Sequence, residues 1–325
     1  MGRGGAWDAG FGLHARSHAA QAEACTTTGH ALALLLMVLV VGCRSPGRDG
    51  APQAFFPERV TPLPQLVASI NANNQAIPTL FASGDLEATI YDETGRKRSL
   101  VGDVSLLYRK PRELLFRVKK DVVGTVLAIG STDDRYWLSA SQEAGDTMWW
   151  GYHANAGKPG TQQVPIRPDL VIEVLGLGIV GTDLLRPPVP AVRFNTDASA
   201  YMLTWQSPVE GYWRVEKEIW YDYKTHLPVK VILYDREGRP VLRANLSEHR
   251  RLAVEGLPQE RWPAVATRFG LFFPQSRSSM SITLGGRGQD LALQKRGLPR
   301  EGTITFGMGP DVARTVQLDA ESPQR

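Results

Sequence analysis

From residue 80 to residue 284 the apolar side chains recur at every second position in one short segment after another. This period limits the segments to strands. The segment "LEATIY" places Leu86, Ala88 and Ile90 on one face, since successive side chains of a strand point to opposite faces. The same alternation occurs in "VSLLY", "LLFRV", "TVLAIG", "RYWLSA" and "TMWWGYH". Turn sequences such as "DETGRK" at 92–97 separate them, so about six antiparallel strands in succession are predicted.

Two segments have helical spacing instead. "PLPQLVASINANNQAI" predicts a helix from about residue 62 to residue 77, and "PDLVIEVLGL" predicts a short helix from about Pro168 to Leu175. The alternation resumes near Tyr201 and predicts four to six more strands. Long strands with so few helices to cover them predict a mainly β (α+β) fold. Its form would be a strongly curved antiparallel sheet, or incomplete β-barrel, covered by a few helices.

The segment "ALALLLMVLVVGCRS", residues 31–45, decides how the N-terminus is interpreted. Its apolar run is shorter than the roughly 20 residues that a spanning helix needs, and it suits the apolar region of a signal peptide. The small Gly42 followed by Cys43 resembles the lipobox of bacterial lipoproteins, in which the cysteine is diacylated after cleavage. Residues 1–42 are therefore predicted to be a signal peptide with an over-long start. The alternative is a cysteine that follows an apolar run by chance.

Three further regions follow along the chain. Residues 43–61 contain three prolines and two glycines and predict a lipid-anchored flexible tether. Residues 62–295 contain the strands and predict one half-barrel domain resembling lipid-binding proteins. The alternation weakens beyond Gly285, so residues 296–325 are predicted to be a weakly structured C-terminal segment.

Charge and cysteine content exclude several classes of protein. The net charge is +4, and short basic clusters such as "GRKR" at 95–98 and "EHRR" at 248–251 favour solvated turns over a nucleic-acid surface. We therefore expect no nucleic-acid partner. The only cysteines are Cys25 and Cys43, so cleavage before Cys43 would leave no free thiol and no disulfide.

Enzyme signatures are scarce. The sequence has no HExxH, GxSxG or P-loop, and "GLGIVG" at 176–181 follows a helical segment rather than a strand. His153, His226 and His249 stand apart in the sequence, and a satisfied histidine is more frequent than a metal ligand. A turn explains Asp133-Asp134. We expect no catalytic residues, no metal and no cofactor, and therefore no enzyme. An envelope hydrolase with a site assembled from distant residues stays open.

The lipobox, the tether, the first helix and the meandering strands together resemble the LolA/LolB family of periplasmic lipoprotein carriers and receptors. The segments "PRELLFRVKKDVVGTVLAIGSTDDRYWL" (111–138), "LPVKVILYDREGRPVLRANLSEH" and "VPIRPDLVIEVLGL" are similar to paired strands, a later hairpin and a helical insert of that family. The resemblance implies an incomplete β-barrel closed by helices, with a concave apolar cavity that accepts acyl chains.

The resemblance also implies site residues. The cavity would be lined by alternating apolar and aromatic side chains, namely Leu106, Tyr108, Phe116, Val118, Met148, Trp150, Tyr152, Trp205 and Trp213. Large aromatic side chains equally fill a solid core, and that alternative stays open. Val122 and Val123 would form the exposed apolar loop that the anchored receptor uses. A bulge or a buried corner is the alternative for these two valines.

These observations predict a membrane-anchored lipoprotein that faces the periplasm and binds a lipid or an acylated protein. It would be a monomer held to the membrane by its lipid anchor and would serve lipoprotein or lipid transport to the outer membrane. Arg44, directly after the cysteine, is not the aspartate that in some bacteria signals inner-membrane retention, which favours the outer membrane. The alternative is a structural or interaction lipoprotein of the envelope with a filled core and no ligand.

Overall fold

Strands dominate the residues described by the computed structural model, which are 57, 59–91, 94–141, 146–156 and 168–320. The predicted signal peptide, Cys43 and the tether up to residue 56 lie outside them. Within these residues the helices are α2 (Leu63–Gln75) and α3 (Pro168–Val174), together with the short 3-10 helices η2 (His153–Asn155) and η4 (Gln259–Arg261). Among the described residues, no helix combines the length and apolar character needed to cross a membrane.

The strands match the predicted alternation closely. The first group is β1 (Thr79–Tyr91), β2 (Lys97–Arg109), β3 (Glu113–Lys120), β4 (Gly124–Ser131), β5 (Arg135–Ala140) and β6 (Thr147–Tyr152). The second is β7 (Val189–Asn195), β8 (Ala200–Val209), β9 (Tyr212–Asp222), β10 (Pro228–Tyr234), β11 (Pro240–Ser247), β14 (Arg268–Phe273) and β15 (Ser278–Leu284). Four short strands complete the set: β12 (Arg250–Arg251), β13 (Ala264–Val265), β16 (Leu291–Ala292) and β17 (Arg314–Gln317). The six strands predicted before residue 153 are confirmed.

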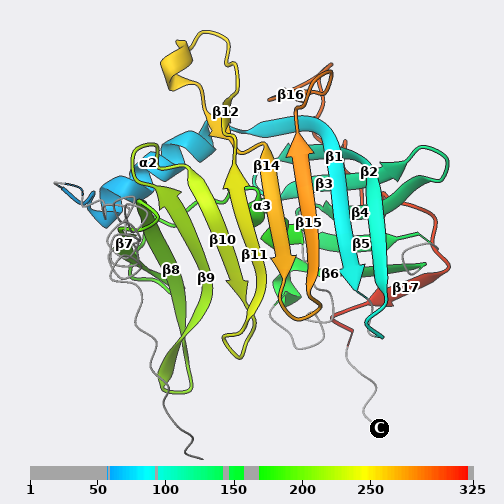
Figure 1. Ribbon diagram of the computed structural model, residues 1–325, viewed down its shortest axis with the longest axis horizontal. Helices are drawn as coiled ribbons and strands as arrows, with labels where there is room; N and C mark the ends of the chain where they lie inside the picture. The colour runs from blue at the N-terminus through cyan, green and yellow to red at the C-terminus, as the bar shows by residue number, and fades with distance from the viewer. Residues whose placement is uncertain (1–56, 58, 92–93, 142–145, 157–167, 321–325) are drawn as a thin grey trace, which may run out of the picture. The chain divides into compact units, whose positions relative to one another are not determined.

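One large sheet holds nearly all of these strands (Figure 1). Its order is β17-β6-β5-β4-β3-β2-β1-β15-β14-β11-β10-β9-β8-β7, with β16 added beside β1 and with β12 and β13 paired separately. Each of the end strands, β17 and β7, has one partner in the described part of the chain, so the sheet is open. The mainly β, curved-sheet prediction is confirmed at this level.

The two halves of the sheet join where β1 pairs with β15, in the register Gly84↔Leu284 to Thr89↔Ser279. β1 also pairs with β2 along its whole length. The joint is tight at Gly84, where any Cβ would lie 2.0 Å from the carbonyl oxygen of Thr283. Glycine is therefore required at this position, because only a residue without a side chain lets the two backbones approach so closely.

The sheet bends around α3. This helix contacts β4 and β5 in one half of the sheet and β10 in the other, and Figure 1 shows it behind the strands of the second half. The inner, concave face carries the main apolar core, to which α2, α3 and nearly every long strand contribute side chains. The outer, convex face is more polar, as the alternating burial of β10 and β11 shows.

The C-terminal residues cover part of the outer face. Residues 296–325 have no strand period, yet Ile304 is buried against Leu107, Leu115 and Trp137, and the Trp137 indole N–H donates to the Met308 carbonyl at 3.0 Å. β17 then extends the sheet in parallel beside β6. Within residues 299–319 the only helix or strand is β17, with four residues, and the weakly structured C-terminal segment stays a prediction. Isolated side chains fix the segment, and isolated contacts leave no periodic pattern in a sequence.

Two buried amide side chains of α2 join this helix to the segment after α3. Asn71 Nδ2 donates to the Val180 carbonyl at 2.8 Å, and the Val180 N–H donates back to Asn71 Oδ1 at 2.9 Å. Asn74 Nδ2 donates to the carbonyls of Gly176 and Gly178 at 3.0 and 2.7 Å. Residues 176–180 have no helix or strand of their own, so these amides supply partners that buried backbone groups require.

Replacing Asn74 by alanine should therefore destabilise the fold. The carbonyls of Gly176 and Gly178 would lose their donor inside the core, which costs about 1–3 kcal/mol in the free energy of unfolding. Urea denaturation measures this change. Gln75→Ala removes an exposed amide of the same helix and should change the stability by less than about 0.5 kcal/mol. Equal effects of the two substitutions would contradict the role given to Asn74.

Candidate functional site

Five of the side chains predicted for a ligand cavity lie together on the concave face. They come from β2, β3 and β8, and they are Leu106, Tyr108, Phe116, Val118 and Trp205. All five are buried in the main core. The sequence alternation thus placed this part of the predicted set on one apolar surface, and its role in binding a ligand stays a prediction.

Helix α3 and the residues after it cover this surface. Their side chains join the same apolar core as the sheet: Ile172, Val174, Leu175, Leu177 and Val180. In the described part of the chain, the concave face is therefore closed by protein side chains. The cover is a separate segment rather than part of the sheet, and the amides of α2 hold its backbone in place.

An ion pair joins α3 to the sheet at the edge of the apolar core. Lys217 Nζ of β9 lies 2.5 Å from Glu173 Oε1 of α3 and 4.7 Å from the centre of the Trp205 ring. Both charged side chains are 22% exposed. Because both side chains keep contact with water, the pair is worth about 1 kcal/mol. A cation held over an aromatic ring adds to the attachment.

Two buried phenols belong to the same region. Burial, reinforced by the negative charge of Glu173, raises the pKa of Tyr108 to about 12. The same two causes, burial first, raise the pKa of Tyr221. Both phenols therefore stay neutral at pH 7.

The remaining predicted cavity residues lie elsewhere. Met148 and Trp150 of β6 pack on the outer face with Phe306 of the C-terminal segment, and the Trp150 and Phe306 ring centres are 5.3 Å apart. Tyr152 meets Trp150 edge to face on the same side of the sheet, with the ring centres 5.4 Å apart. Trp213 is 55% exposed beside the β8–β9 turn. β6 is apolar on both faces, so its alternation could not tell which face is concave.

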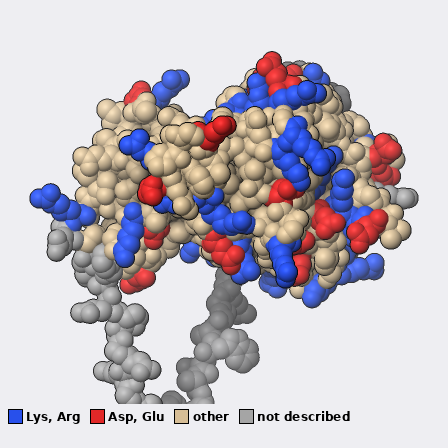
Figure 2. Space-filling model, turned by 90° about the horizontal axis from the view of Figure 1, so that it is seen from above, with Lys and Arg blue, Asp and Glu red and all other residues tan. Residues whose placement is uncertain are grey.

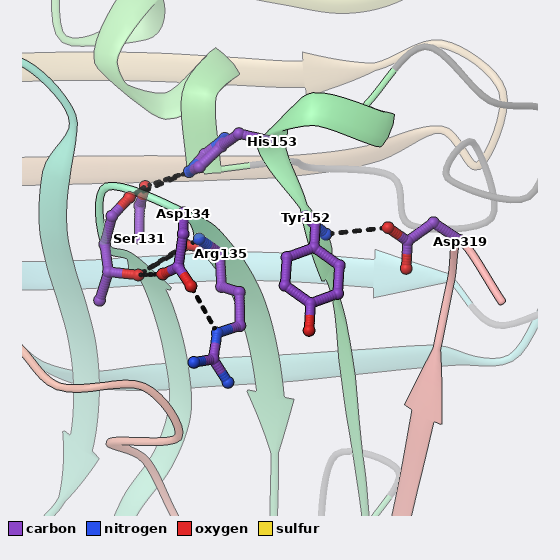
Figure 3. A network of polar contacts seen from close by, with 7 residues as sticks. Ser131, Asp134, Arg135, Tyr152, His153 and Asp319 are labelled. Atoms are coloured by element: carbon purple, nitrogen blue, oxygen red, sulfur yellow. Dashed lines mark hydrogen bonds and ion pairs between the residues drawn. The ribbon is translucent and has the colours of Figure 1, made fainter.

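A polar network ties the β4–β5 turn to the end of β6 (Figure 3). The Asp134 carboxylate accepts hydrogen bonds from Thr132 Oγ1 at 2.8 Å and from Arg135 Nε at 3.0 Å, which is the turn role predicted for it. His153 Nε2 lies 3.0 Å from Ser131 Oγ and 3.1 Å from the Thr132 carbonyl. A carbonyl oxygen only accepts, so Nε2 must carry the proton and cannot take one from Ser131. Ser131 is also fully buried, and the pair is therefore structural rather than nucleophilic.

The β3–β4 turn presents the two valines singled out by the sequence. Val122 is 97% exposed and Val123 is 50% exposed. They stand beside Lys119 and Lys120 at the end of β3, and Gly124 closes the turn with φ +82°. The buried corner considered as an alternative is not what the structure shows.

His226 and His249 make local contacts. His226 Nδ1 lies 2.9 Å from Ser69 Oγ, and His249 Nε2 lies 2.9 Å from the Pro228 carbonyl. Burial lowers the pKa of both histidines. No group of three or more His, Cys, Asp or Glu side chains suited to a metal occurs among the described residues. Seen from above, basic and acidic side chains are interspersed over the surface (Figure 2).

No protein-family model and no curated protein sequence matches this chain. Several solved structures are similar to it. A candidate outer membrane lipoprotein-sorting protein domain from Vibrio parahaemolyticus has 13% identity and a TM-score of 0.47 over 72% of this chain and 92% of that chain. A LolA superfamily protein from Nitrosomonas europaea has 11% identity and a TM-score of 0.43, covering 70% and 94% of the two chains.

A third similar structure is a DUF1329 family protein from Desulfovibrio piger, with 12% identity and a TM-score of 0.44 over 72% of this chain and 93% of that chain.

Asp319 fixes the end of the C-terminal segment and should make its attachment sensitive to acid. It accepts hydrogen bonds from the Tyr152 N–H at 3.1 Å and from Asn155 Nδ2 at 2.8 Å (Figure 3 shows the Tyr152 contact). Burial alone would raise the pKa of Asp319, but these hydrogen bonds and one from Gln317 outweigh burial and lower the pKa below its ordinary 3.8. A carboxylate whose pKa is lowered in the folded state stabilises it above pH 3.8, and this stabilisation is lost as the pH falls through the folded-state pKa.

Asp319→Asn should therefore lower the free energy of unfolding at pH 7 by about 1–3 kcal/mol. The difference from the parent protein should shrink as the pH falls below 3.8. Denaturation by urea at a series of pH values measures both. Asp311→Asn, at an exposed position of the same segment, is the control and should have little effect. A difference that does not change with pH would contradict the role of the Asp319 charge.

Proposed function

We propose that this protein binds one acyl chain, of a lipid or of an acylated protein, on the concave face of its sheet beneath α3. One observation carries the proposal: the apolar concave face is covered by a separate segment, residues 168–180, that is held by a few polar contacts. Such a cover can leave the sheet without breaking the sheet's own hydrogen bonds. The apolar side chains of the segment fill a space that an acyl chain would fill in their place.

Burial of an acyl chain and burial of the covering side chains of residues 168–180 stabilise the protein by comparable free energies. Each methylene of a bound acyl chain gains about 0.8 kcal/mol on burial, so a chain of ordinary length gains enough to replace the contacts of a few aliphatic side chains. Opening also breaks the contact between Glu173 and Lys217. The Lys217 ammonium group would then face the carboxylate, phosphate or ester end of the ligand. We propose no covalent step and no cofactor.

The anchor and the valine turn complete the proposal. Acylation of Cys43 would hold the protein at a membrane, facing the periplasm, with the outer membrane favoured by the arginine at position 44. Val122, exposed beside two lysines, would enter the membrane surface when an acyl chain is passed on. The protein would act as a monomer in lipoprotein or lipid transport.

Uptake of a fluorescent fatty acid by the Cys43→Ser protein, purified without detergent, tests the acyl site. Glu173→Gln removes one half of the ion pair and leaves Lys217 free for the ligand. Since a partly exposed pair is worth about 1 kcal/mol, the variant should bind the probe about fivefold more tightly. Glu218→Gln is the control, because this carboxylate of β9 bonds Trp220 on the outer face.

Native mass spectrometry of the same proteins would show any lipid that is retained during purification. Uptake by neither the parent protein nor Glu173→Gln would overturn the acyl proposal. The alternative would then stand, in which the protein is a structural or interaction module with a permanently filled core. If Glu173→Gln and Glu218→Gln raised the affinity for the fatty acid equally, the ion pair between Glu173 and Lys217 would not control access to the concave face.

The valine turn gives a separate prediction. Val122→Glu in the Cys43→Ser protein should weaken binding to phospholipid vesicles about tenfold, since burial of a valine side chain is worth about 1.5 kcal/mol. Vesicle flotation measures the bound fraction. Val101→Glu, at a position 63% exposed on β2, should leave the bound fraction unchanged. Loss of binding in both variants would point to a general charge effect and not to the turn.

A further inference from the structure

The outer face of β10, β11 and β14 forms an open hollow of about 640 Å³. It lies on the side of the sheet opposite to α3, and Figure 1 draws no helix in front of these strands. The side chains that rim it include Lys230, Ile232, Arg243, Asn245 and Phe272. They occupy neighbouring register positions, with Lys230 opposite Asn245 and Arg243 opposite Phe272.

Two cations at this hollow are available to a ligand. Among the described residues, neither Lys230 nor Arg243 has a carboxylate within ion-pair distance, whereas Arg214, Lys217 and Arg268 on neighbouring strands each have one. Lys230 Nζ instead lies 4.1 Å from the centre of the Trp220 ring. The two residues are diagonal neighbours on adjacent strands, roughly 7–8 Å apart, so both can contact a single anionic group.

The Glu218 carboxylate, on the strand next to Lys230, already has hydrogen-bond partners of its own. Glu218 of β9 is buried, and its oxygens accept hydrogen bonds from Trp220 Nε1 at 2.5 Å and from Thr204 Oγ1 at 3.3 Å. Burial and the charge of Glu218 raise the pKa of Tyr234, and the guanidinium groups of Arg243 and Arg193 oppose that shift.

Gly270 and Phe272 of β14 leave room in the hollow for a flat ring of a ligand. At Gly270 an added Cβ would meet nothing within 4 Å, so the space above this residue is open. Phe272, two residues along β14, is 40% exposed and presents an aromatic surface beside that space. Asn245 lies opposite Gly270 and brings an amide that both donates and accepts hydrogen bonds.

We propose that this hollow binds an acidic saccharide. One sugar ring would lie over Gly270 against Phe272, its acidic group would contact Lys230 and Arg243, and its hydroxyl groups would bond Asn245. Charge-assisted hydrogen bonds to cations and contact with an aromatic face are the interactions that such a ligand uses.

Calorimetric titration of the Cys43→Ser protein with trigalacturonate at low ionic strength tests the proposal, because salt screens exposed charges. Maltotriose is the neutral comparison. Trigalacturonate should bind and maltotriose should not. Lys230→Gln and Arg243→Gln should each weaken trigalacturonate binding about tenfold, as expected for the loss of one charge-assisted contact.

Gly270→Val supplies a variant that blocks the hollow without disturbing the fold. The new side chain enters open space on a strand, where a β-branched residue is favourable, and binding should fall at least tenfold. Arg268→Gln is the control on the same strand, because this guanidinium is already paired with Glu248 at 3.0 Å. It should change the affinity less than twofold.

Titration with inorganic phosphate and with phosphatidylglycerol vesicles tests two other anionic ligands, a free phosphate and a lipid headgroup. Absence of trigalacturonate binding would overturn the proposal. Binding of phosphate or vesicles that depends on Lys230 and Arg243, with no binding of the saccharide, would overturn it as well. Equal weakening by Arg268→Gln and Arg243→Gln would show unspecific attraction to positive charge, which also overturns it. The site is on the face opposite to the acyl site, so the fatty-acid experiment can fail or succeed independently.

Discussion

The closed state of the concave face depends on the two buried amides of α2. A stretch of backbone without helix or strand lies inside the apolar core after α3, and its carbonyls must find donors there. Asn71 and Asn74 supply them. Without these amides the segment would leave carbonyls unpaired in the core, and the apolar inner surfaces of the two sheet halves would lose their shared cover. The amides therefore link helix, cover and sheet.

Much of the fold could be predicted because alternation is a local property. Period-two segments predicted β1 to β6 and most of β8 to β15, and helical spacing predicted α2 and α3. Edge and short strands escaped the prediction, since β7 contains Pro190 and β17 has only four residues. β14, a six-residue strand inside the sheet, escaped it too. The joint between β1 and β15 was beyond reach as well. It pairs residues about 200 positions apart in the sequence, such as Gly84 and Leu284. The glycine that the close approach at position 84 requires is the one local sign of this pairing.

The site could be predicted only in part, for a related reason. Alternation sorts side chains into two faces but does not say which face is concave. It therefore grouped Trp150 with Phe116, although the two lie on opposite sides of the sheet. The asparagines in "NANN" occupy the apolar stripe of a predicted helix. Polar residues at core positions are a usable signal of a buried hydrogen-bonded partner, but the sequence does not reveal which backbone they meet.

The placement of the C-terminal segment has a consequence for the order of folding. Residues near 304–308 cover an aromatic surface that includes Trp137 and Trp150, and β17 protects the edge beside β6. A chain emerging from its N-terminus can form β1 to β6 early, yet it must leave this surface and this edge uncovered until its last residues are available. Exposed aromatic surface and a free strand edge are what drive self-association. Chains shortened at the C-terminus would therefore be prone to aggregate even with every long strand present.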